Sequence, residues 1–144
     1  MIVPRRKQNN RAMKKVLIFG AFDGIHEGHR NLFRQAKLHG DYLVVAVAAD
    51  NIIQQLKHRL PKLTLAERIA AVAAEVGVDE AVAGDELLGS YNIVKSHSPD
   101  IIALGYDQED LREDLEERKG EFGFDVEIVM LEPYQPEQFH NSLL

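Results

Sequence analysis

The chain has 144 residues, of which 45% are hydrophobic and 28% are charged, a composition typical of a globular protein of about one domain. It contains no cysteine, which excludes a disulfide framework and a thiolate zinc site and makes the cytoplasm the simplest compartment. No apolar run approaches the roughly 18 residues of a membrane-spanning helix, and no signal-peptide pattern opens the chain, so no membrane partner is expected.

The net charge of −6 is unevenly distributed along the chain. Residues 1–15 carry six basic side chains and no acidic one; subtracting these six leaves 11 basic against 23 acidic residues, a net charge of −12 for the remainder. An acidic body argues against broad nucleic-acid binding, which needs a basic surface. We therefore expect residues 1–13 to form a flexible basic tail and residues 14–144 to form one domain. A nucleic-acid-binding arm is the alternative for the tail.

Apolar runs alternate with amphipathic stretches along this domain. Continuous apolar runs predict buried strands, and shorter apolar segments predict further strands. The five predicted strands are residues 16–19, 42–49, 80–83, 101–104 and 124–131. Four helices are predicted. The first covers residues 30–38 and is ended by Gly40, and the last covers residues 108–119. The second is opened by a capping box at Thr64 and Glu67, and one of its faces carries Leu65, Ile69, Val72 and Val76. The third contains Leu87, Tyr91 and Val94 and stops before Pro99.

This alternation predicts an α/β fold, a Rossmann-like three-layer sandwich with a five-stranded parallel sheet. In such sheets the ligand lies beyond the carboxyl ends of the strands, where the strand order reverses. The segments expected at that edge are residues 20–29, Asp50 with a following loop, residues 84–85 and residues 105–108.

The segment GAFDGIHEGH, residues 20–29, carries most of the chemical information. It joins a predicted strand to a predicted helix, where free backbone N–H groups would face an anion. Gly20 and Gly24 would permit close approach of the backbone, and Gly28 would leave room for a nucleotide. His26 and His29 could then give charge-assisted hydrogen bonds to phosphate oxygens. The alternative is a metal site with Glu27 as a third ligand, which would leave the glycines unexplained.

Together with GDYLVVAV at residues 40–47, this segment resembles the cytidylyltransferase-like nucleotidyltransferases, whose pattern is G-[TA]-F-D-x-x-H-x-G-H. The resemblance covers about residues 15–144. It implies that a phosphomonoester oxygen attacks the α-phosphorus of ATP or CTP and that pyrophosphate leaves without a covalent enzyme intermediate. It also implies help from a divalent cation, usually Mg²⁺, with no assignable protein ligand. The family is commonly dimeric, which leaves a homodimer open.

The resemblance also implies roles for individual residues. His26, His29 and Lys57 would be catalytic, and Tyr106 and Gln108 would contact the acceptor. The expected nucleotide-binding residues are Gly20, Ala21, Phe22, Asp23, Gly28, Arg68, Gly105, Asp107 and Ser142.

Three of these residues have plainer alternatives. Lys57 could belong to a solvated loop with His58, Arg59 and Lys62. Arg68 could be an ordinary helix-surface arginine. Asp107 could be the N-cap of the helix that follows it.

The acceptor is suggested by two weaker signals. The segment ALGYDQ, residues 103–108, looks most like the archaeal-type FAD synthases, which implies FMN as acceptor. Near the C-terminus, Ser142 alone preserves a hydroxyl of the family's serine- and threonine-containing turn, and an arginine typical of the glycerol-3-phosphate enzymes is absent. The alternatives are a cytidylyltransferase for a small polyol or amino-alcohol phosphate and a nucleotide-binding protein without turnover.

Overall fold

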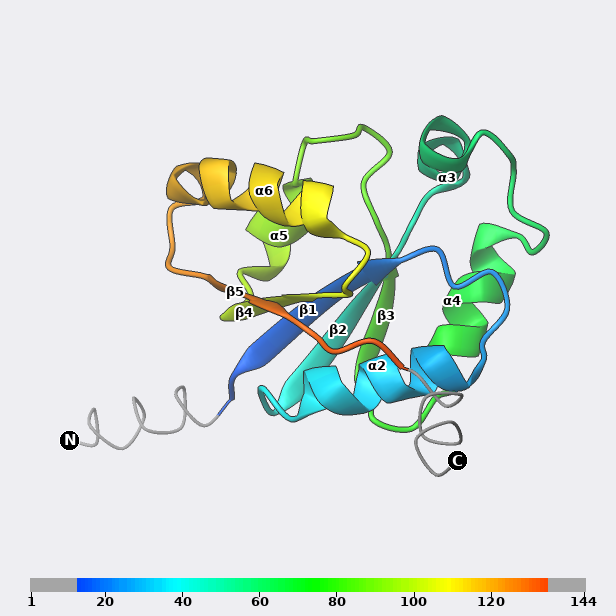
Figure 1. Ribbon diagram of the computed structural model, residues 1–144, viewed down its shortest axis with the longest axis horizontal. Coiled ribbons are helices and arrows are strands. Elements are labelled where there is room, and N and C mark those ends of the chain that lie inside the picture. The colour runs from blue at the N-terminus through cyan, green and yellow to red at the C-terminus, as the bar shows by residue number, and fades with distance from the viewer. Residues whose placement is uncertain (1–12, 135–144) are drawn as a thin grey trace, which may run out of the picture.

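The computed structural model describes residues 13–134, so the predicted tail (apart from Met13) and Ser142 lie outside the described residues. Within that range, five parallel strands form one sheet in the order β3-β2-β1-β4-β5, with helices on both faces (Figure 1). The strands are β1 (Lys15–Gly20), β2 (Tyr42–Val47), β3 (Glu80–Ala83), β4 (Ile101–Leu104) and β5 (Glu127–Met130). This confirms the predicted α/β architecture.

The two central strands are buried on both faces, which explains why their sequences are continuous apolar runs. Along β1, Val16 and Ile18 pack into one core while Leu17, between them, packs into the other. Phe33 and Val72 join the first core, which lies under α2 (Glu27–Lys37) and α4 (Leu65–Ala73). The second core lies on the other face of the sheet and includes Val94 and Leu115 from the helices on that face. The helices are α2 (Glu27–Lys37), α3 (Asp50–Lys57), α4 (Leu65–Ala73), α5 (Asn92–His97), α6 (Glu109–Arg118) and a 3₁₀ turn at Lys119–Glu121.

Some predicted boundaries are wrong. Residues 50–57, expected to be part of a loop, form α3, which buries Ile52 and Ile53. The helix α4 ends at Ala73, so Val76 is 94% exposed instead of lying on its inner face. The third predicted helix is confined to residues 92–97, and Leu87 is exposed. Strands β2 and β5 are also shorter than predicted: β2 ends at Val47, and β5 covers Glu127–Met130.

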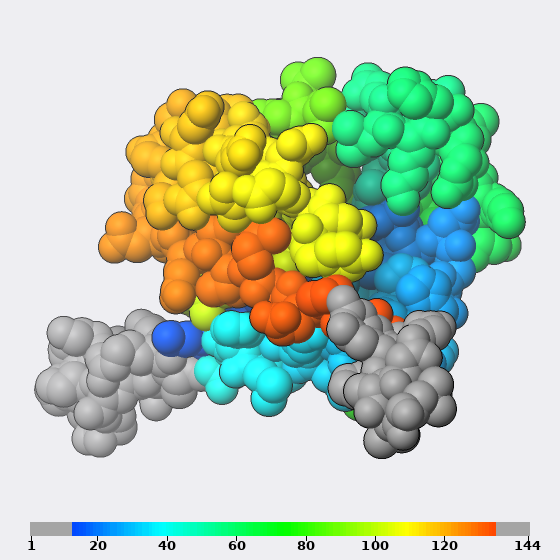
Figure 2. Space-filling model, viewed as in Figure 1, coloured from blue at the N-terminus to red at the C-terminus, as the bar shows by residue number. Residues whose placement is uncertain are grey.

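The strand order reverses at β1, which pairs with β2 on one side and with β4 on the other. The loops that follow β1, β2 and β4 therefore meet at the carboxyl edge of the sheet. Figure 2 shows the surface hollowed at this edge, between the segment following β4 and the segment containing α3. No helix among residues 13–134 is long and apolar enough to cross a membrane.

Candidate active site

The turn after β1 is set by Phe22. Its backbone has a φ of +52°, a left-handed conformation that is costly for a bulky residue, and its side chain is only 3% exposed. The ring packs 5.5 Å from Phe33 and 5.1 Å from His29, measured between ring centroids. It also covers Gly20, where a Cβ would lie 2.6 Å from the Phe22 ring. The glycine and the buried aromatic ring thus define one turn that leads the chain into α2.

Helix α2 begins on the two motif histidines. His26 is the N-cap residue, and its Nδ1 accepts a hydrogen bond from the backbone N–H of Gly28 at 3.0 Å. The Nδ1 of His29 accepts a hydrogen bond from the backbone N–H of His26 at 3.2 Å. The two rings stack with their centroids 3.8 Å apart. The motif therefore forms a reciprocal capping box in which imidazoles replace the usual serine and glutamate.

These caps determine which ring nitrogens carry a proton. A nitrogen that accepts a bond from an N–H must present a lone pair, so a neutral ring carries its proton on Nε2. Neither Nε2 has a hydrogen-bond partner among the described residues. Burial, followed by the influence of His26, Lys57 and Arg30, lowers the pKa of His29 to about 4. His29 is thus neutral near pH 7 and still has an Nε2–H to donate, while its predicted contact with phosphate stays a prediction.

Gly28 is needed for a reason the sequence did not indicate. A Cβ at this position would lie 2.9 Å from Cε1 and 3.1 Å from Nδ1 of His26, within the cap itself. The glycine therefore makes room for the His26 ring, whereas its predicted contact with a nucleotide stays a prediction. Tyr134 also approaches this position, because its Cδ2 would lie 3.7 Å from the same Cβ.

Asp23 ties the loop after β1 to the segment before α4. Its two carboxylate oxygens accept hydrogen bonds from the backbone N–H groups of Lys62, at 2.8 Å, and Leu63, at 2.9 Å. These bonds lower the pKa of Asp23 below its usual value. The resemblance allowed this acid to organise either the loop or a metal, and the observed contacts are those of a loop organiser.

Arg68 is fully buried, so the alternative of a helix-surface arginine is wrong. Its Nη1 donates to the backbone oxygens of Ala21 and Ala48, its Nε donates to that of Leu63, and its Nη2 donates to Asp50 at 2.6 Å. One guanidinium thereby joins the loops after β1 and β2 to the start of α4. Direct contact with a nucleotide stays a prediction, and the burial of the side chain argues against it.

Lys57 is the last residue of α3, and the exposed residues His58 and Arg59 follow it. His58 ends the helix with a φ of +60°. The positive charge of Lys57 contributes to the lowered pKa of His29 by disfavouring protonation of its ring. Lys57 is thus the cation of this segment that the structure links to the histidine pair. Its role in catalysis stays a prediction.

The loop after β4 closes the other side of the site. The Oε1 of Gln108 accepts a hydrogen bond from the N–H of Gly105, and its Nε2 donates to the backbone oxygen of Phe19. Gln108 therefore fastens this loop to the end of β1, and contact with an acceptor would be an additional role. Tyr106 and Asp107 are exposed at this edge. Helix α6 begins after Gln108, so the alternative of Asp107 as N-cap is wrong.

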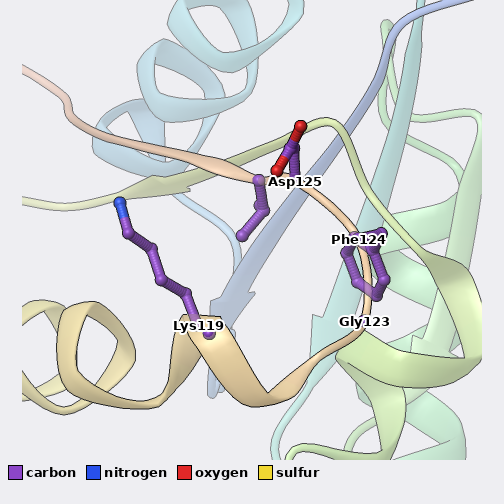
Figure 3. Close-up of a pocket in the computed structure, with 6 residues that line it drawn as sticks. Lys119, Gly123, Phe124 and Asp125 are labelled. Carbon is purple, nitrogen blue, oxygen red and sulfur yellow. The ribbon is translucent and has the colours of Figure 1, made fainter.

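The described residues contain no group of three or more acidic or histidine side chains that could hold a metal ion. A separate, open hollow lies elsewhere, between the end of α6 and the turn before β5, and is lined by Lys119, Phe124 and Asp125 (Figure 3). It shares no residue with the histidine site.

Two contributors to this edge were missed. Asp50 was placed at the edge without a role, although it is the ionic partner of Arg68. Tyr134, which stands where the glycerol-3-phosphate enzymes have an arginine, was given no role. Helical spacing gives a signal for the burial of Arg68, because it lies three residues after Leu65 and four before Val72. The position of Tyr134 depends on contacts across almost the whole chain, which no local pattern reports.

Comparisons with known proteins agree with this geometry. The family model described as cytidylyltransferase-like matches residues 17–143. A FAD synthase of Ferroglobus placidus is 43% identical over 125 residues, which cover 83% of this chain and 76% of that protein. A FAD synthase of Thermococcus sibiricus is 39% identical over 120 residues, covering 83% and 80% of the two chains.

Solved structures support the same assignment. A lipopolysaccharide core biosynthesis protein from Thermoplasma volcanium superposes with a TM-score of 0.80 at 33% identity, covering 85% of this chain and 99% of that one. A pantoate-beta-alanine ligase from Francisella tularensis shares the fold alone, with a TM-score of 0.60 at 14% identity, covering 92% of this chain and 66% of that one. The histidine-capped helix at the switch point of a five-stranded parallel sheet and these likenesses together show that the chain belongs to the cytidylyltransferase-like family of nucleotidyltransferases.

Proposed function

We propose that this protein transfers a nucleoside monophosphate from ATP or CTP to FMN, with release of pyrophosphate. The observation that carries the proposal is the stacked pair His26 and His29, whose Nε2–H groups are left available at the start of α2. The choice of FMN is supported by the relatives named FAD synthase, which are 38–43% identical over 83–85% of the chain in several archaea.

The proposed reaction is an in-line displacement at phosphorus. A phosphate oxygen of FMN forms a bond to the α-phosphorus of the nucleotide, and the bond from that phosphorus to the bridging oxygen of pyrophosphate breaks. Charge builds up on the oxygens of the α-phosphate during this step. His26 and His29 would donate their Nε2–H groups to these oxygens, and their orientation is fixed in advance by the caps on Nδ1. Lys57 would neutralise the departing pyrophosphate.

A divalent cation, which we expect to be Mg²⁺, would assist by neutralising phosphate charge. The chain fits a cation that takes most of its ligands from phosphate oxygens and water, as Mg²⁺ usually does, because the described residues form no acidic or histidine cluster. Both oxygens of Asp23 accept backbone hydrogen bonds, so this carboxylate is held in place by the loop whether or not a cation is bound. Removal of the cation with a chelator should therefore abolish turnover without unfolding the protein.

The test is pyrophosphate release by the purified protein with Mg²⁺ and either ATP or CTP. FMN, glycerol 3-phosphate, phosphocholine and heptose 1-phosphate are offered one at a time, and the flavin product is identified by mass. Release with FMN alone supports the proposal. Release only with a small polyol phosphate contradicts the flavin assignment, and nucleotide binding without release from any acceptor favours a protein without turnover.

A second candidate acceptor is a small polyol or sugar phosphate. The observation that favours it is the likeness to the Thermoplasma volcanium protein, which covers 99% of that chain and is named for lipopolysaccharide core biosynthesis. The same acceptor panel separates the two candidates.

Action in the cytoplasm and assembly as a homodimer stay predictions, to be tested by fractionation and by light scattering.

A further inference from the structure

The chain after β5 crosses helix α2 as a short strap, residues 131–134. Leu131 anchors its start: its N–H donates to the backbone oxygen of Leu104, and its side chain is only 4% exposed in the core beside α2. From there the strap runs across the sheet towards the beginning of α2 (Figure 1). It therefore leads from the acceptor-side strands β4 and β5 to the helix that carries the two histidines.

Gln35 holds the middle of the strap with both ends of its side-chain amide. Its Nε2 donates to the backbone oxygen of Glu132 at 2.8 Å, and its Oε1 accepts from the backbone N–H of Glu132 at 2.8 Å. The same Nε2 donates to Oδ1 of Asn31, one turn earlier on the helix, at 2.7 Å. The glutamine thus pairs with the strap as a neighbouring strand would. Only a side-chain amide can give and accept these bonds together.

The far end of the strap brings Tyr134 to the motif. The rings of Tyr134 and His26 both approach the position that a Cβ on Gly28 would occupy, with Cδ2 of Tyr134 at 3.7 Å and Cε1 of His26 at 2.9 Å from it. Tyr134 is 39% exposed, so one part of its ring packs on the helix start and another part faces outward. Tyr134 therefore lies next to the histidine cap, at Gly28.

The positions of the basic side chains indicate which substrate binds on the side of the strap. Lys57 ends α3, and Arg59 and Lys62 follow it in a segment that in Figure 1 lies on the other side of the loop after β1 from the strap. The leaving pyrophosphate carries the larger negative charge and fits the cationic side. In-line displacement places the attacking group opposite the leaving group. The strap side then receives the acceptor.

We propose that the strap, fastened by Gln35, forms the acceptor side of the site and that Tyr134 packs against the planar ring of the acceptor. This inference rests on the proposed function for the identity of the ring as that of FMN. Gln35 touches no substrate and is a positioning residue. Tyr134 supplies a contact of the kind that aromatic rings make with one another.

The experiment compares Gln35→Met, Tyr134→Leu and Tyr134→Phe with a control, Arg34→Met, whose side chain is exposed on the same helix. Kinetics with ATP and FMN give a KM for each substrate. We expect Gln35→Met and Tyr134→Leu to raise the KM for FMN roughly fivefold, the scale of one aromatic contact, while the KM for ATP changes less than about twofold. Tyr134→Phe and Arg34→Met should resemble the wild type. An equal rise in both KM values, or none, overturns the proposal.

Hydrogen exchange tests the strap independently of turnover. The backbone N–H of Glu132 should exchange about tenfold faster in Gln35→Met than in the wild type or Arg34→Met, as expected for loss of its hydrogen bonds. Unchanged exchange means that Gln35 does not hold the strap. If the wild type uses a different acceptor from FMN, the flavin assignment fails, and the strap proposal is judged on the KM for that acceptor.

Discussion

The loop after β1 and the segment that starts at the end of α3 lie at the same edge of the sheet, yet their side chains are held very differently. In the first, Phe22, Asp23 and both histidines are fixed by packing or by bonds to backbone groups. In the second, Lys57 and Arg59 are exposed. The groups that would meet charge developing at phosphorus are oriented before substrate arrives, while the cations that would meet pyrophosphate must be ordered by it.

This difference follows from the role that we propose for each of the two segments. A neutral imidazole N–H is a modest donor, and it stabilises a transition state efficiently only if no energy is spent on reorienting it. A lysine acts as a compact charge on a flexible stem and can adjust its position to a polyphosphate. Four experiments separate the two kinds of group, and their expected effects fall from a large loss of stability to a small dependence on pH.

Arg68→Met should have the largest effect, on stability. The substitution leaves three part-buried backbone oxygens and Asp50 without their partner, which costs about 3 kcal/mol of unfolding free energy. Chemical denaturation measures this loss. Asp50→Asn should cost much less, because Asp50 is half exposed. If the Arg68→Met variant proves as stable as the wild type, the guanidinium does not join these loops.

His29→Ala should lower kcat by roughly a hundredfold, the usual effect of removing one preoriented donor. Steady-state pyrophosphate release measures it, and circular dichroism checks that the fold is kept. His39→Ala is the matched control, since His39 is exposed beyond the end of α2 and should leave kcat unchanged. Activity of His29→Ala within a few-fold of wild type would remove the histidine from the phosphate site.

Lys57→Ala should reduce kcat/KM by about tenfold, less than the histidine variant because the lysine is exposed and its charge is screened. Raising the salt concentration should shrink the difference between Lys57→Ala and the wild type. Lys95→Ala, an exposed lysine on α5, serves as the control. If the loss does not depend on salt, Lys57 acts by a means other than its charge.

The smallest effect concerns pH. The pKa of His29 is lowered from 6.5 to about 4, so the unfolded chain binds more protons than the folded one between these values. This contribution to stability is present above pH 6.5 and is lost as pH falls towards 4. Denaturation midpoints measured across this window should decline less steeply in His29→Asn than in the wild type. Parallel declines would show that the histidine is not held neutral.

The sequence predicts the sheet well and the site only in part, for physical reasons. Strands β1 and β2 are predictable because burial on both faces leaves an unbroken apolar run, and α4 is announced by the capping box at Thr64, which the structure confirms. Helix α3 was missed because it is short and has no side-chain cap. Val76 continues the helical spacing of α4, but the chain has already left the helix, and Gly77 adopts a φ of +92°.

The site residues differ in the same way. The motif locates His26 and His29, but their use as a helix cap is not predictable, because histidine is not a usual capping residue. The bonds from Gln108 to Phe19 and from Gln35 to Glu132 span 89 and 97 residues, so only the folded chain brings them together. The local sequence pattern identifies the reactive side chains of the turn, whereas the contacts that hold the turn in place come from residues far away in the sequence.

The histidine caps also determine how the rings can move and what else can bind them. A surface imidazole normally rotates by half a turn and exchanges the positions of its two nitrogens. Here that rotation would take each Nδ1 away from the backbone N–H it accepts and would uncap the first turn of α2. Coordination of a metal ion such as Zn²⁺ at Nε2 would need a lone pair on that nitrogen, so the ring proton would have to move to Nδ1, which faces a backbone N–H. The caps therefore disfavour metal binding by these rings and keep both Nε2–H groups as donors.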